Sequence, residues 1–357
     1  MVNFRKLVTS AHSQLDVDPL RVFASLDRKA SHAGLRQAQE AALVALHAKR
    51  GERDLVLKMP TGLGKSAVGS LMLQSYMLSS GQGCVYLCPT VQLVKQVLAE
   101  ADRLGLRAHE YPANQPHPHP DCLGGRALTV CTYDKLFNAR TTFEHDDVRF
   151  TPHAIVCDDA HSGIEEVRDA FTLRVRLPEA CMALRKVIAN ACDTYQRGTW
   201  EDIAADQPRV ALELPYWLWF PLVDEARAAL SPFAASDEFK FVWPRLRDRL
   251  RWTRLVISAE GFEISPIVVP VEEAAPYQRA AHRIFMSATL ADDSVLVSML
   301  GCTDSAARSP ICAGTESPPG ERLVVAPSLI DPSLNREWLV RWAAASSQNY
   351  NVVVLCA

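Results

Sequence analysis

Short apolar runs alternate along the chain with longer stretches of helical periodicity. The runs cover residues 54–57, 84–88, 128–132, 154–157 and 284–290, and each is typical of a buried strand. Helical patterns follow at 67–78 and from 91 onward. Because strands and helices alternate in this way, the pattern predicts an α/β fold with a parallel sheet.

The first of these strands leads directly into a glycine-rich loop, Met59-Pro-Thr-Gly-Leu-Gly-Lys-Ser66. Gly62 and Gly64 permit the tight turns that bring backbone N–H groups onto the phosphates of a nucleotide. The Lys65 ammonium is expected to reach the β- and γ-phosphates, and the Ser66 hydroxyl to ligate magnesium. The predicted nucleotide contacts in this loop are Thr61, Gly62, Leu63, Gly64, Lys65 and Ser66. Met59 replaces the usual first glycine, and the alternative is an incidental glycine-rich turn.

Two aspartates stand at the end of the apolar run 154–157. Asp158 is expected to hold magnesium, and Asp159 to orient and deprotonate an attacking water. The alternative is that the pair only caps the helix that follows. The phosphate loop elsewhere in the chain favours the magnesium interpretation.

Three further polar residues lie where strands end or helices begin. Gln39 opens a helix and can read the adenine edge through its amide, or it can be a solvated helix start. Thr90 follows a strand and can hold a nucleic-acid phosphate. Tyr133 can stack on a base or cap the core.

Composition and charge limit the class of protein. The chain has 357 residues, 48% hydrophobic and 22% charged, with net charge −3, so it suits a globular protein of more than one domain. Any binding to a polyanion must therefore depend on local grooves. Ten cysteines are scattered, several within apolar runs, which indicates a reducing compartment. We find no apolar run long enough to span a membrane and expect a soluble, cytoplasmic protein.

A proline-rich stretch at 109–125 contains His109, His117, His119 and Cys122. A complete ligand set with familiar spacing is missing from this stretch. We therefore expect exposed loop residues here rather than a metal site.

Residues 166–270 carry helical patterns without a phosphate-site motif, which predicts a mostly helical insertion. Its segment 245–254 is the most basic of the chain, with Trp243 and Trp252 nearby. This segment can contact nucleic acid, or it can be an amphipathic helix with a solvated basic face. Trp217, Trp219 and Phe220 are expected in the core.

Five motifs in order resemble those of superfamily 2 DEAD/DEAH-type helicases. They are a Q-type motif at 35–39, motif I at 59–66, motif Ia at 89–96, motif II at 158–161 and motif III at 287–289. The insertion between motifs II and III, the Met-Pro-Thr-Gly opening and the Met-Ser-Ala-Thr-Leu ending are most similar to the XPD/DinG branch.

This resemblance implies a RecA-like P-loop NTPase fold, with ATP and magnesium held between two lobes and single-stranded or forked DNA bound across them. Lys65, Asp158, Asp159 and His161 then serve catalysis, and Ser287 and Thr289 couple the nucleotide to DNA. Thr90, Gln96 and Tyr133 are expected to touch the strand. The insertion occupies the position of an arch domain, which can also receive a protein partner.

The domains expected from this resemblance are an N-terminal helical segment at 1–33, a first lobe at 34–165 and 271–312, and the insertion at 166–270. Residues 313–357 are expected to be a linker and the start of an incomplete second lobe, with strands at 322–326 and 352–356 and a helix at 335–345.

The chain departs from the family pattern in three ways. Asp159 replaces the usual glutamate. Between motifs I and II we find no four-cysteine set, since Cys84 and Cys88 belong to a strand, so we expect no iron–sulfur cluster. Motifs V and VI, with their arginine, do not follow, and we expect a fragment that binds ATP and turns it over slowly. A nucleotide-binding scaffold with little turnover and an RNA-directed helicase are the alternatives.

Overall fold

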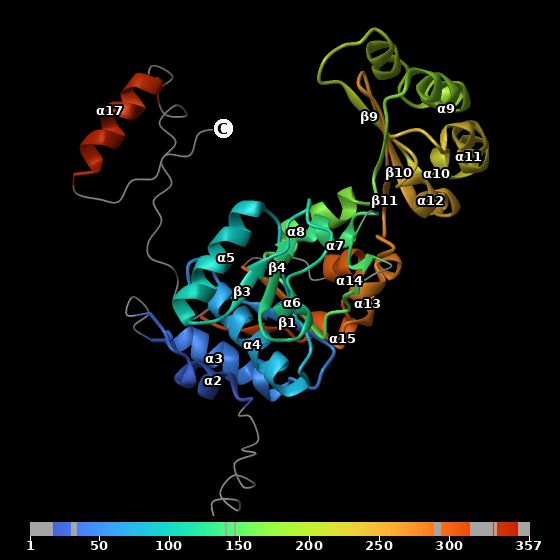
Figure 1. Cartoon of the computed structure of the whole chain (residues 1–357). Coiled ribbons are helices and arrows are strands. Elements are labelled where there is room, and N and C mark those ends of the chain that lie inside the picture. The colour runs from blue at the N-terminus through green and yellow to red at the C-terminus, as the bar shows by residue number, and fades with distance from the viewer. Residues whose placement is uncertain are drawn as a thin grey trace, which may run out of the picture. The chain divides into compact units, whose positions relative to one another are not determined.

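The computed structural model describes residues 17–29, 34–139, 141–145, 148–288, 294–314, 331 and 334–348 (Figure 1). The chain divides into two compact units, residues 1–316 and 317–357. In the second unit, helix α17 (Arg336–Ser346) confirms the predicted helix, and Asn335 caps it by accepting a hydrogen bond from the Trp338 N–H at 3.1 Å. The strands predicted at 322–326 and 352–356 lie outside the described residues.

A seven-stranded parallel sheet organises the first unit, in the order β13-β1-β12-β7-β2-β4-β3. This sheet confirms the predicted α/β fold. Its strands are β1 (Asp54–Lys58), β2 (Val85–Cys88), β3 (Ala108–Glu110), β4 (Leu128–Thr132), β7 (Ala154–Cys157), β12 (His282–Ser287) and β13 (Ile311–Cys312). The short strands β3 and β13 were not predicted, and His109, expected in a loop, lies in β3. Strand β12 pairs with both β1 and β7, and its register places Ser287 opposite Lys58.

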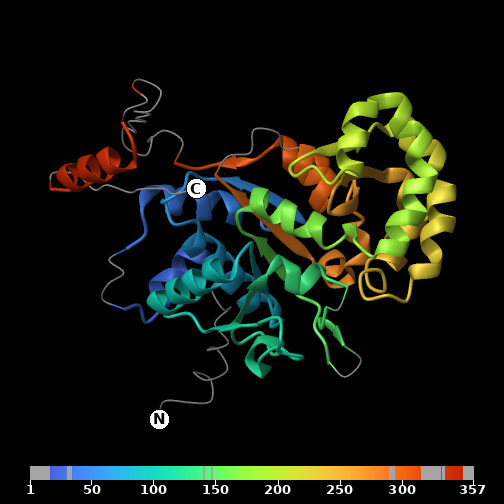
Figure 2. The ribbon, with the colours of Figure 1, turned by 90° about the horizontal axis from the view of Figure 1, so that it is seen from above.

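Helices cover both faces of this sheet (Figure 2). One face carries α2 (Pro19–Ser25), α3 (Gln37–Ala48), α4 (Lys65–Ser80) and α5 (Val91–Leu104). The other carries α7 (Tyr133–Phe137), α8 (Ala160–Asp169), α13 (Ala275–Arg279), α14 (Ser294–Leu300) and α15 (Asp304–Arg308). Successive strand residues face opposite layers: Leu55 and Leu57 pack with the first set, and Val56 with the second.

Shorter elements complete the sheet domain. They are α6 (Pro120–Leu123), η4 (Val271–Glu273) and the two-stranded ribbon β5 (Glu144–His145) and β6 (Val148–Arg149). Asp18 caps helix α2, because its side chain accepts a hydrogen bond from the Leu20 N–H at 2.9 Å. Throughout the described parts of the chain, no helix has both the length and the apolar character needed to cross a bilayer.

The insertion has a four-stranded antiparallel sheet and a hydrophobic core of its own. Figure 1 shows its helices gathered around β9, β10 and β11. Its strands are β8 (Leu173–Val175), β9 (Ala211–Leu214), β10 (Thr253–Ser258) and β11 (Gly261–Pro266), and its helices are α9 (Pro178–Ala204), α10 (Tyr216–Trp219), η1 (Phe220–Leu222), α11 (Val223–Leu230), η2 (Ser231–Phe233), α12 (Trp243–Leu246) and η3 (Arg247–Trp252). Helices make up most of it, as predicted, but the sheet was missed. Its strands are short, and β10 alternates buried with half-buried residues, a weaker pattern than that of a continuous apolar run.

A buried ion pair joins the amino ends of β1 and β12. The Asp54 carboxylate accepts hydrogen bonds from Arg283 Nε at 2.7 Å and Nη2 at 2.8 Å, and from the Thr303 N–H at 2.8 Å. Arg283 Nη2 also donates to the Gly301 carbonyl. Both charged side chains are almost completely buried, so these bonds offset a large desolvation cost.

Candidate nucleotide-binding site

The glycine-rich loop links β1 to α4 through two left-handed residues. Gly62 has φ +81° and Gly64 has φ +82°, and α4 begins at Lys65. A residue with a side chain would be strained in this region. At Gly64, an added Cβ would also lie 2.3 Å from Gln39 Nε2. The loop therefore requires glycine where the sequence has it.

Lys65 lies half-buried at the start of α4. Its Nζ donates a hydrogen bond to the Met59 carbonyl at 3.1 Å, across the loop. Burial lowers the pKa of Lys65, and the negative charges of Asp158 and Asp159 oppose this effect. The ammonium and the two carboxylates therefore belong to one electrostatic cluster.

Asp158 follows β7 directly and is 6% exposed. Its N–H donates to the Leu87 carbonyl of β2, and its Oδ1 accepts from the Asp159 N–H at 3.0 Å. Burial raises the pKa of Asp158, while the Tyr86 hydroxyl, the Asp159 N–H and the charge of Lys65 favour its ionised form. A buried carboxylate held in this way suits a cation ligand.

Asp159 is half-buried with a left-handed backbone, at φ +41°, immediately before α8. Its Oδ2 accepts a hydrogen bond from Ser162 Oγ at 2.8 Å. This non-glycine strain lies next to the predicted magnesium ligand, as is common where a side chain is held for function.

The Gln39 amide connects the start of α3 to the glycine-rich loop. Its Oε1 accepts from the Arg36 N–H at 2.8 Å, and its Nε2 donates to the Gly64 carbonyl at 3.2 Å. The Arg36 guanidinium donates to the Gly62 carbonyl. Gln39 thus supports the loop, a role that sequence reasoning did not assign to it. Its reading of adenine stays a prediction.

A single cavity of about 680 Å³ brings most of the predicted nucleotide and magnesium contacts together. Its lining includes Gln39, Thr61, Gly62, Gly64, Lys65, Ser66, Asp158 and Asp159. Leu63 instead packs against the core under α3. The sequence interpretation missed Arg36, Glu100, Arg103 and Ala288, which also line the cavity. Arg36 follows Leu35 directly in the Q-type motif, and that position could have identified it.

Two of the predicted nucleic-acid contacts lie on α5. Thr90 is exposed and caps this helix by accepting a hydrogen bond from the Leu93 N–H at 3.3 Å. Gln96 is exposed nearly two turns further on and lines the candidate cavity itself. Both side chains are therefore accessible to a ligand.

Tyr133 does not have the predicted exposure. It is completely buried, its hydroxyl donates to the Asp158 carbonyl at 2.9 Å, and Gly163 of α8 leaves the space that its ring fills. The predicted contact with nucleic acid is wrong in this structure, and the core-cap interpretation is confirmed. Tyr133 instead fixes the main chain of the predicted magnesium ligand.

Of the residues predicted to serve coupling and catalysis, Ser287 lies at the same edge of the sheet as the glycine-rich loop. Ser287 is buried at the end of β12, and its carbonyl accepts from the Met59 N–H at 3.0 Å, so motif III contacts the start of the phosphate loop. His161 is exposed in the first turn of α8 and is not among the cavity-lining residues. Thr289 lies outside the described residues.

The histidines of the proline-rich stretch do come together in part. His109 and His119 stack at 3.7 Å between ring centroids, and with Asp121 they offer ligand atoms within 4.8 Å of one another. However, His119 Nδ1 accepts from the Asp121 N–H at 3.2 Å, and the Asp121 carboxylate binds Arg126 at 2.7 Å. These bonds occupy His119 Nδ1 and one oxygen of the Asp121 carboxylate. Cys122 is buried apart from this group, with Sγ 3.5 Å from the Leu128 carbonyl.

Cys84 and Cys88 lie in the core at and within β2. Burial raises the pKa of the Cys84 thiol to about 12. The expectation of no iron–sulfur cluster stays a prediction.

The basic segment 245–254 is not one amphipathic helix but runs from α12 through η3 into β10. Arg245 donates to the Phe137 carbonyl, Arg249 pairs with Glu273 at 2.8 Å, and Arg251 pairs with Asp224 at 3.1 Å. Much of its charge is thus neutralised within the protein. Trp243 is buried, whereas Trp252 is 65% exposed.

Trp219 is buried as predicted, but Trp217 and Phe220 are exposed, so the core prediction is wrong for these two. Helix α10 is a single turn, so only some of its aromatic side chains can face the core.

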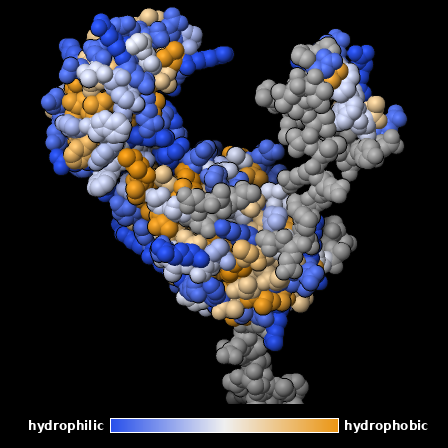
Figure 3. All heavy atoms as spheres, turned by 180° about the vertical axis from the view of Figure 1, so that it is seen from behind, coloured by the Kyte–Doolittle hydropathy of each residue, from blue (hydrophilic) through white to orange (hydrophobic). Residues whose placement is uncertain are grey.

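In the space-filling view, hydrophobic and hydrophilic residues are interspersed on the face shown in Figure 3.

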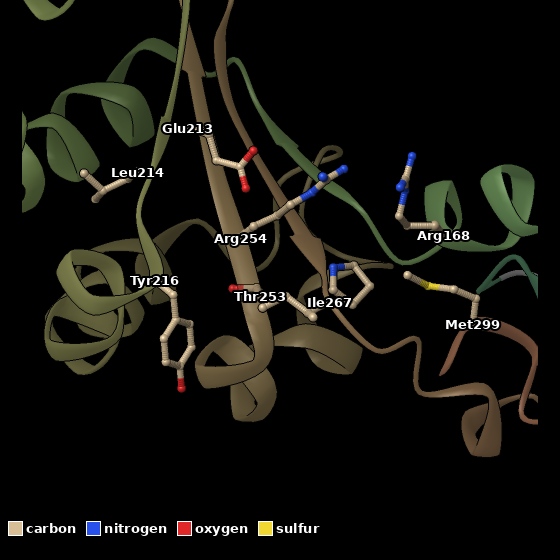
Figure 4. A pocket seen from close by; sticks show the side chains of 9 residues that line it. Arg168, Glu213, Leu214, Tyr216, Thr253, Arg254, Ile267 and Met299 are labelled. Atoms are coloured by element: carbon tan, nitrogen blue, oxygen red, sulfur yellow. The ribbon is translucent and has the colours of Figure 1, made fainter. Parts of the chain in front are cut away.

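A second cavity of about 290 Å³ lies at the base of the insertion (Figure 4). Arg168 of α8 and Met299 of α14 line one side, and Arg254, Tyr216 and Ile267 come from the insertion. Arg254 Nε donates to Ser265 Oγ at 2.9 Å. This cavity is smaller than the nucleotide cavity and shares no lining residue with it.

Most of the residues that line the candidate cavity fall within a stretch that matches a known family. Residues 32–196 match the family described as type III restriction enzyme, res subunit. No curated protein sequence shows significant similarity to the chain.

Solved XPD structures are also similar, at low identity. The structure described as that of S. tokodaii Xpd4 is 17% identical, with 78% of this chain and 61% of that chain covered and a TM-score of 0.45. One described as apo XPD is 12% identical, with 75% and 56% covered and a TM-score of 0.44. One described as truncated XPD is 11% identical, with 79% and 100% covered and a TM-score of 0.39. The chain thus spans less than two thirds of the first two structures. The family match over residues 32–196 agrees with the resemblance to superfamily 2 helicases.

Proposed function

We propose that this chain is the nucleotide-binding part of an ATP-dependent DNA helicase or translocase. One observation carries the proposal: the glycine-rich loop, Gln39, Asp158 and Asp159 line a single cavity. The carboxyl edge of a parallel sheet is where α/β proteins bind nucleotides. The family match over residues 32–196 supports the same conclusion.

The residues present fit Mg–ATP. Gly62 and Gly64 shape the loop so that its N–H groups and the start of α4 can receive phosphates. Ser66 and Asp158 supply the hydroxyl and carboxylate oxygens that magnesium prefers. When bound, magnesium would neutralise phosphate charge. Lys65 would add a positive charge at the β- and γ-phosphates.

Asp159 is assigned to the attacking water. Its carboxylate lines the cavity, and Ser162 holds one of its oxygens. In this role it would orient the water and accept its proton. Because aspartate is one methylene shorter than glutamate, the strained backbone at Asp159 would set how far this carboxylate reaches.

The nucleic-acid side of the proposal depends on exposed residues beside the cavity. Thr90 and Gln96 share α5, and Gln96 also lines the cavity. A DNA strand that contacts this helix would therefore lie close to the nucleotide. Ser287 would connect the two sites through its bond to Met59.

Fast turnover would need an arginine from outside this set of residues. Of the described residues that line the cavity, the arginines are Arg36 and Arg103. Arg36 binds the Gly62 carbonyl, and Arg103 pairs with Glu100. An arginine finger contributes about 10³–10⁵ in rate in related phosphoryl-transfer enzymes. We therefore expect tight Mg–ATP binding and slow hydrolysis by this chain alone.

The experiment is ATP turnover by the 357-residue chain, alone, with single-stranded DNA and with RNA of matching sequence. The test variant is Asp159→Asn, and Asp248→Asn on the exposed surface of the insertion is the matched control. Slow turnover stimulated by DNA and lost only in Asp159→Asn would support the proposal. Turnover unaffected by Asp159→Asn, or absence of Mg–ATP binding, would contradict it.

A nucleotide-dependent scaffold is the second candidate, favoured by the engaged state of Arg36 and Arg103. The two candidates differ in linkage: in a motor, DNA must tighten ATP binding by the same factor as ATP tightens DNA binding. ATP affinity measured with and without single-stranded DNA separates them. No change in affinity would favour the scaffold.

A further inference from the structure

The hydroxyl group of Tyr86, beside the candidate cavity, is buried without a hydrogen-bond partner among the described residues. Tyr86 is completely buried in β2, and among the described residues its hydroxyl oxygen completes no hydrogen bond. A buried polar atom without a partner is destabilising, and phenylalanine would avoid that cost. The hydroxyl therefore requires an explanation.

The surroundings of Tyr86 place its hydroxyl at the predicted magnesium ligands. Burial raises the pKa of Tyr86, the negative charge of Asp158 raises it further, and the Ser66 hydroxyl lowers it. Asp158 responds in turn, since the Tyr86 hydroxyl favours its ionised form. The strand register agrees with this position, because Tyr86 pairs with Val156 and Asp158 lies two residues beyond Val156, on the same side of the sheet. The phenol therefore lies beside Asp158.

The ring cannot move away from this position easily. Tyr86 pairs with Val156 of β7 and Val130 of β4, so both neighbouring strands fix its main chain. Its ring packs under α4 at Gly69, where an added Cβ would lie 2.8 Å from Tyr86 Cε2. Gly69 is three residues after Ser66 and therefore lies on the same face of the helix. The helix has a glycine where the ring needs space.

We propose that Tyr86 is a positioning residue for the magnesium site, and this inference rests on the proposed function. The Tyr86 hydroxyl would donate a hydrogen bond to the Asp158 carboxylate when that carboxylate turns to ligate magnesium. Asp158 Oδ1 already accepts from the Asp159 N–H, so a second donor would fix the orientation of the whole carboxylate. The unpaired phenol is thus a preformed partner for the nucleotide-bound state.

The test measures magnesium dependence and stability, not turnover. Magnesium is titrated at a fixed concentration of ATP, with binding followed by calorimetry, and melting is recorded for the nucleotide-free protein. The test variant is Tyr86→Phe. The matched control is Tyr277→Phe, because Tyr277 is equally buried but its hydroxyl already donates to the Leu300 carbonyl, and neither residue lines the cavity.

For Tyr86→Phe we expect the magnesium midpoint to rise about tenfold, equal to about 1.4 kcal/mol. Melting of the nucleotide-free protein should be unchanged or higher, and ATP binding without magnesium should be unchanged. Tyr277→Phe should show the opposite result, a lower melting temperature with little change in the midpoint.

A native magnesium midpoint in Tyr86→Phe would overturn the inference. So would a clear loss of stability of that variant without nucleotide, because it would show that the hydroxyl is already bonded. If the native chain itself showed no magnesium-dependent ATP binding, the proposed function would fail first. The two failures are therefore distinguishable.

Discussion

Polar residues near the two ends of strand β1 differ in how fully protein groups bond to them. At the amino end, Asp54 receives three N–H groups from Arg283 and Thr303 and is completely buried. At the carboxyl end, Lys65 lines an open cavity and has one bond to a loop carbonyl. The first arrangement leaves the carboxylate few free lone pairs, whereas the second leaves donors for a ligand.

This difference separates structure from function within one sheet. Buried charges whose partners are all protein groups hold the strands together. Two buried polar residues with spare bonding capacity, Asp158 and Tyr86, lie where the chain is expected to bind a ligand. Substitutions at the amino end should therefore lower the free energy of unfolding, whereas substitutions at the carboxyl end should lower the affinity for nucleotide.

The largest expected effect is at the amino end. Asp54→Ala leaves Arg283 buried without its counter-ion, which should lower the free energy of unfolding by about 3–5 kcal/mol. Denaturant unfolding would measure this loss. The control is Asp304→Ala, since Asp304 pairs with Arg308 on the surface and should cost about 1 kcal/mol or less. Equal losses in the two variants would remove the distinction between buried and exposed pairs.

Lys65→Ala should give the reverse result. Loss of a charged donor to phosphate is worth about 1.5–3 kcal/mol, so Mg–ATP affinity should fall by about one to two powers of ten. Stability without nucleotide should change little, because the one bond from Nζ is to a loop carbonyl. Lys58→Ala, at the end of β1, is the control for calorimetric binding. Unchanged affinity in Lys65→Ala would show that the loop does not hold phosphates.

Gly64→Ala tests the loop conformation itself. Its left-handed backbone and the contact of the added Cβ with Gln39 should cost about 1–3 kcal/mol, distributed between stability and ATP binding. Gly198 in α9 has open space around it, so Gly198→Ala is the control and should be neutral or stabilising. A crystal structure of Gly64→Ala with an unaltered loop would contradict the strain argument.

The smallest effect concerns pH and Asp158. Burial raises its pKa in the folded state above 3.8, so the folded protein ionises this group less readily than the unfolded chain does. The loss of stability caused by burying the ionised Asp158 carboxylate is absent well below pH 3.8, grows as pH rises, and is complete above the folded-state pKa. Without nucleotide, Asp158→Asn should be more stable than the native chain at neutral pH, and this advantage should vanish in acid. A pH-independent difference in melting would contradict this assignment.

Local sequence was sufficient for the sheet strands and the phosphate loop. The apolar runs 54–57 and 154–157 gave correct strands because strands covered on both faces are continuously hydrophobic. Gly62 and Gly64 predicted the turn because left-handed backbone needs glycine. Ser287 lies at the end of a strand, as predicted, but its position beside the loop comes from the pairing of β12 with β1, which spans more than 200 residues of sequence.

The aromatic residues show what local sequence cannot decide. Tyr86 lies within β2 and Tyr133 begins α7 directly after β4, yet one hydroxyl is unpaired beside Asp158 and the other donates to the Asp158 carbonyl. Likewise, Trp219 is buried and Trp217 exposed within one turn of helix. The amino-acid sequence by itself determined the strand–loop–helix order and the chemistry available at the loop. Only the tertiary structure decided which hydroxyls, rings and arginines remain accessible, because that depends on neighbours from distant strands and helices.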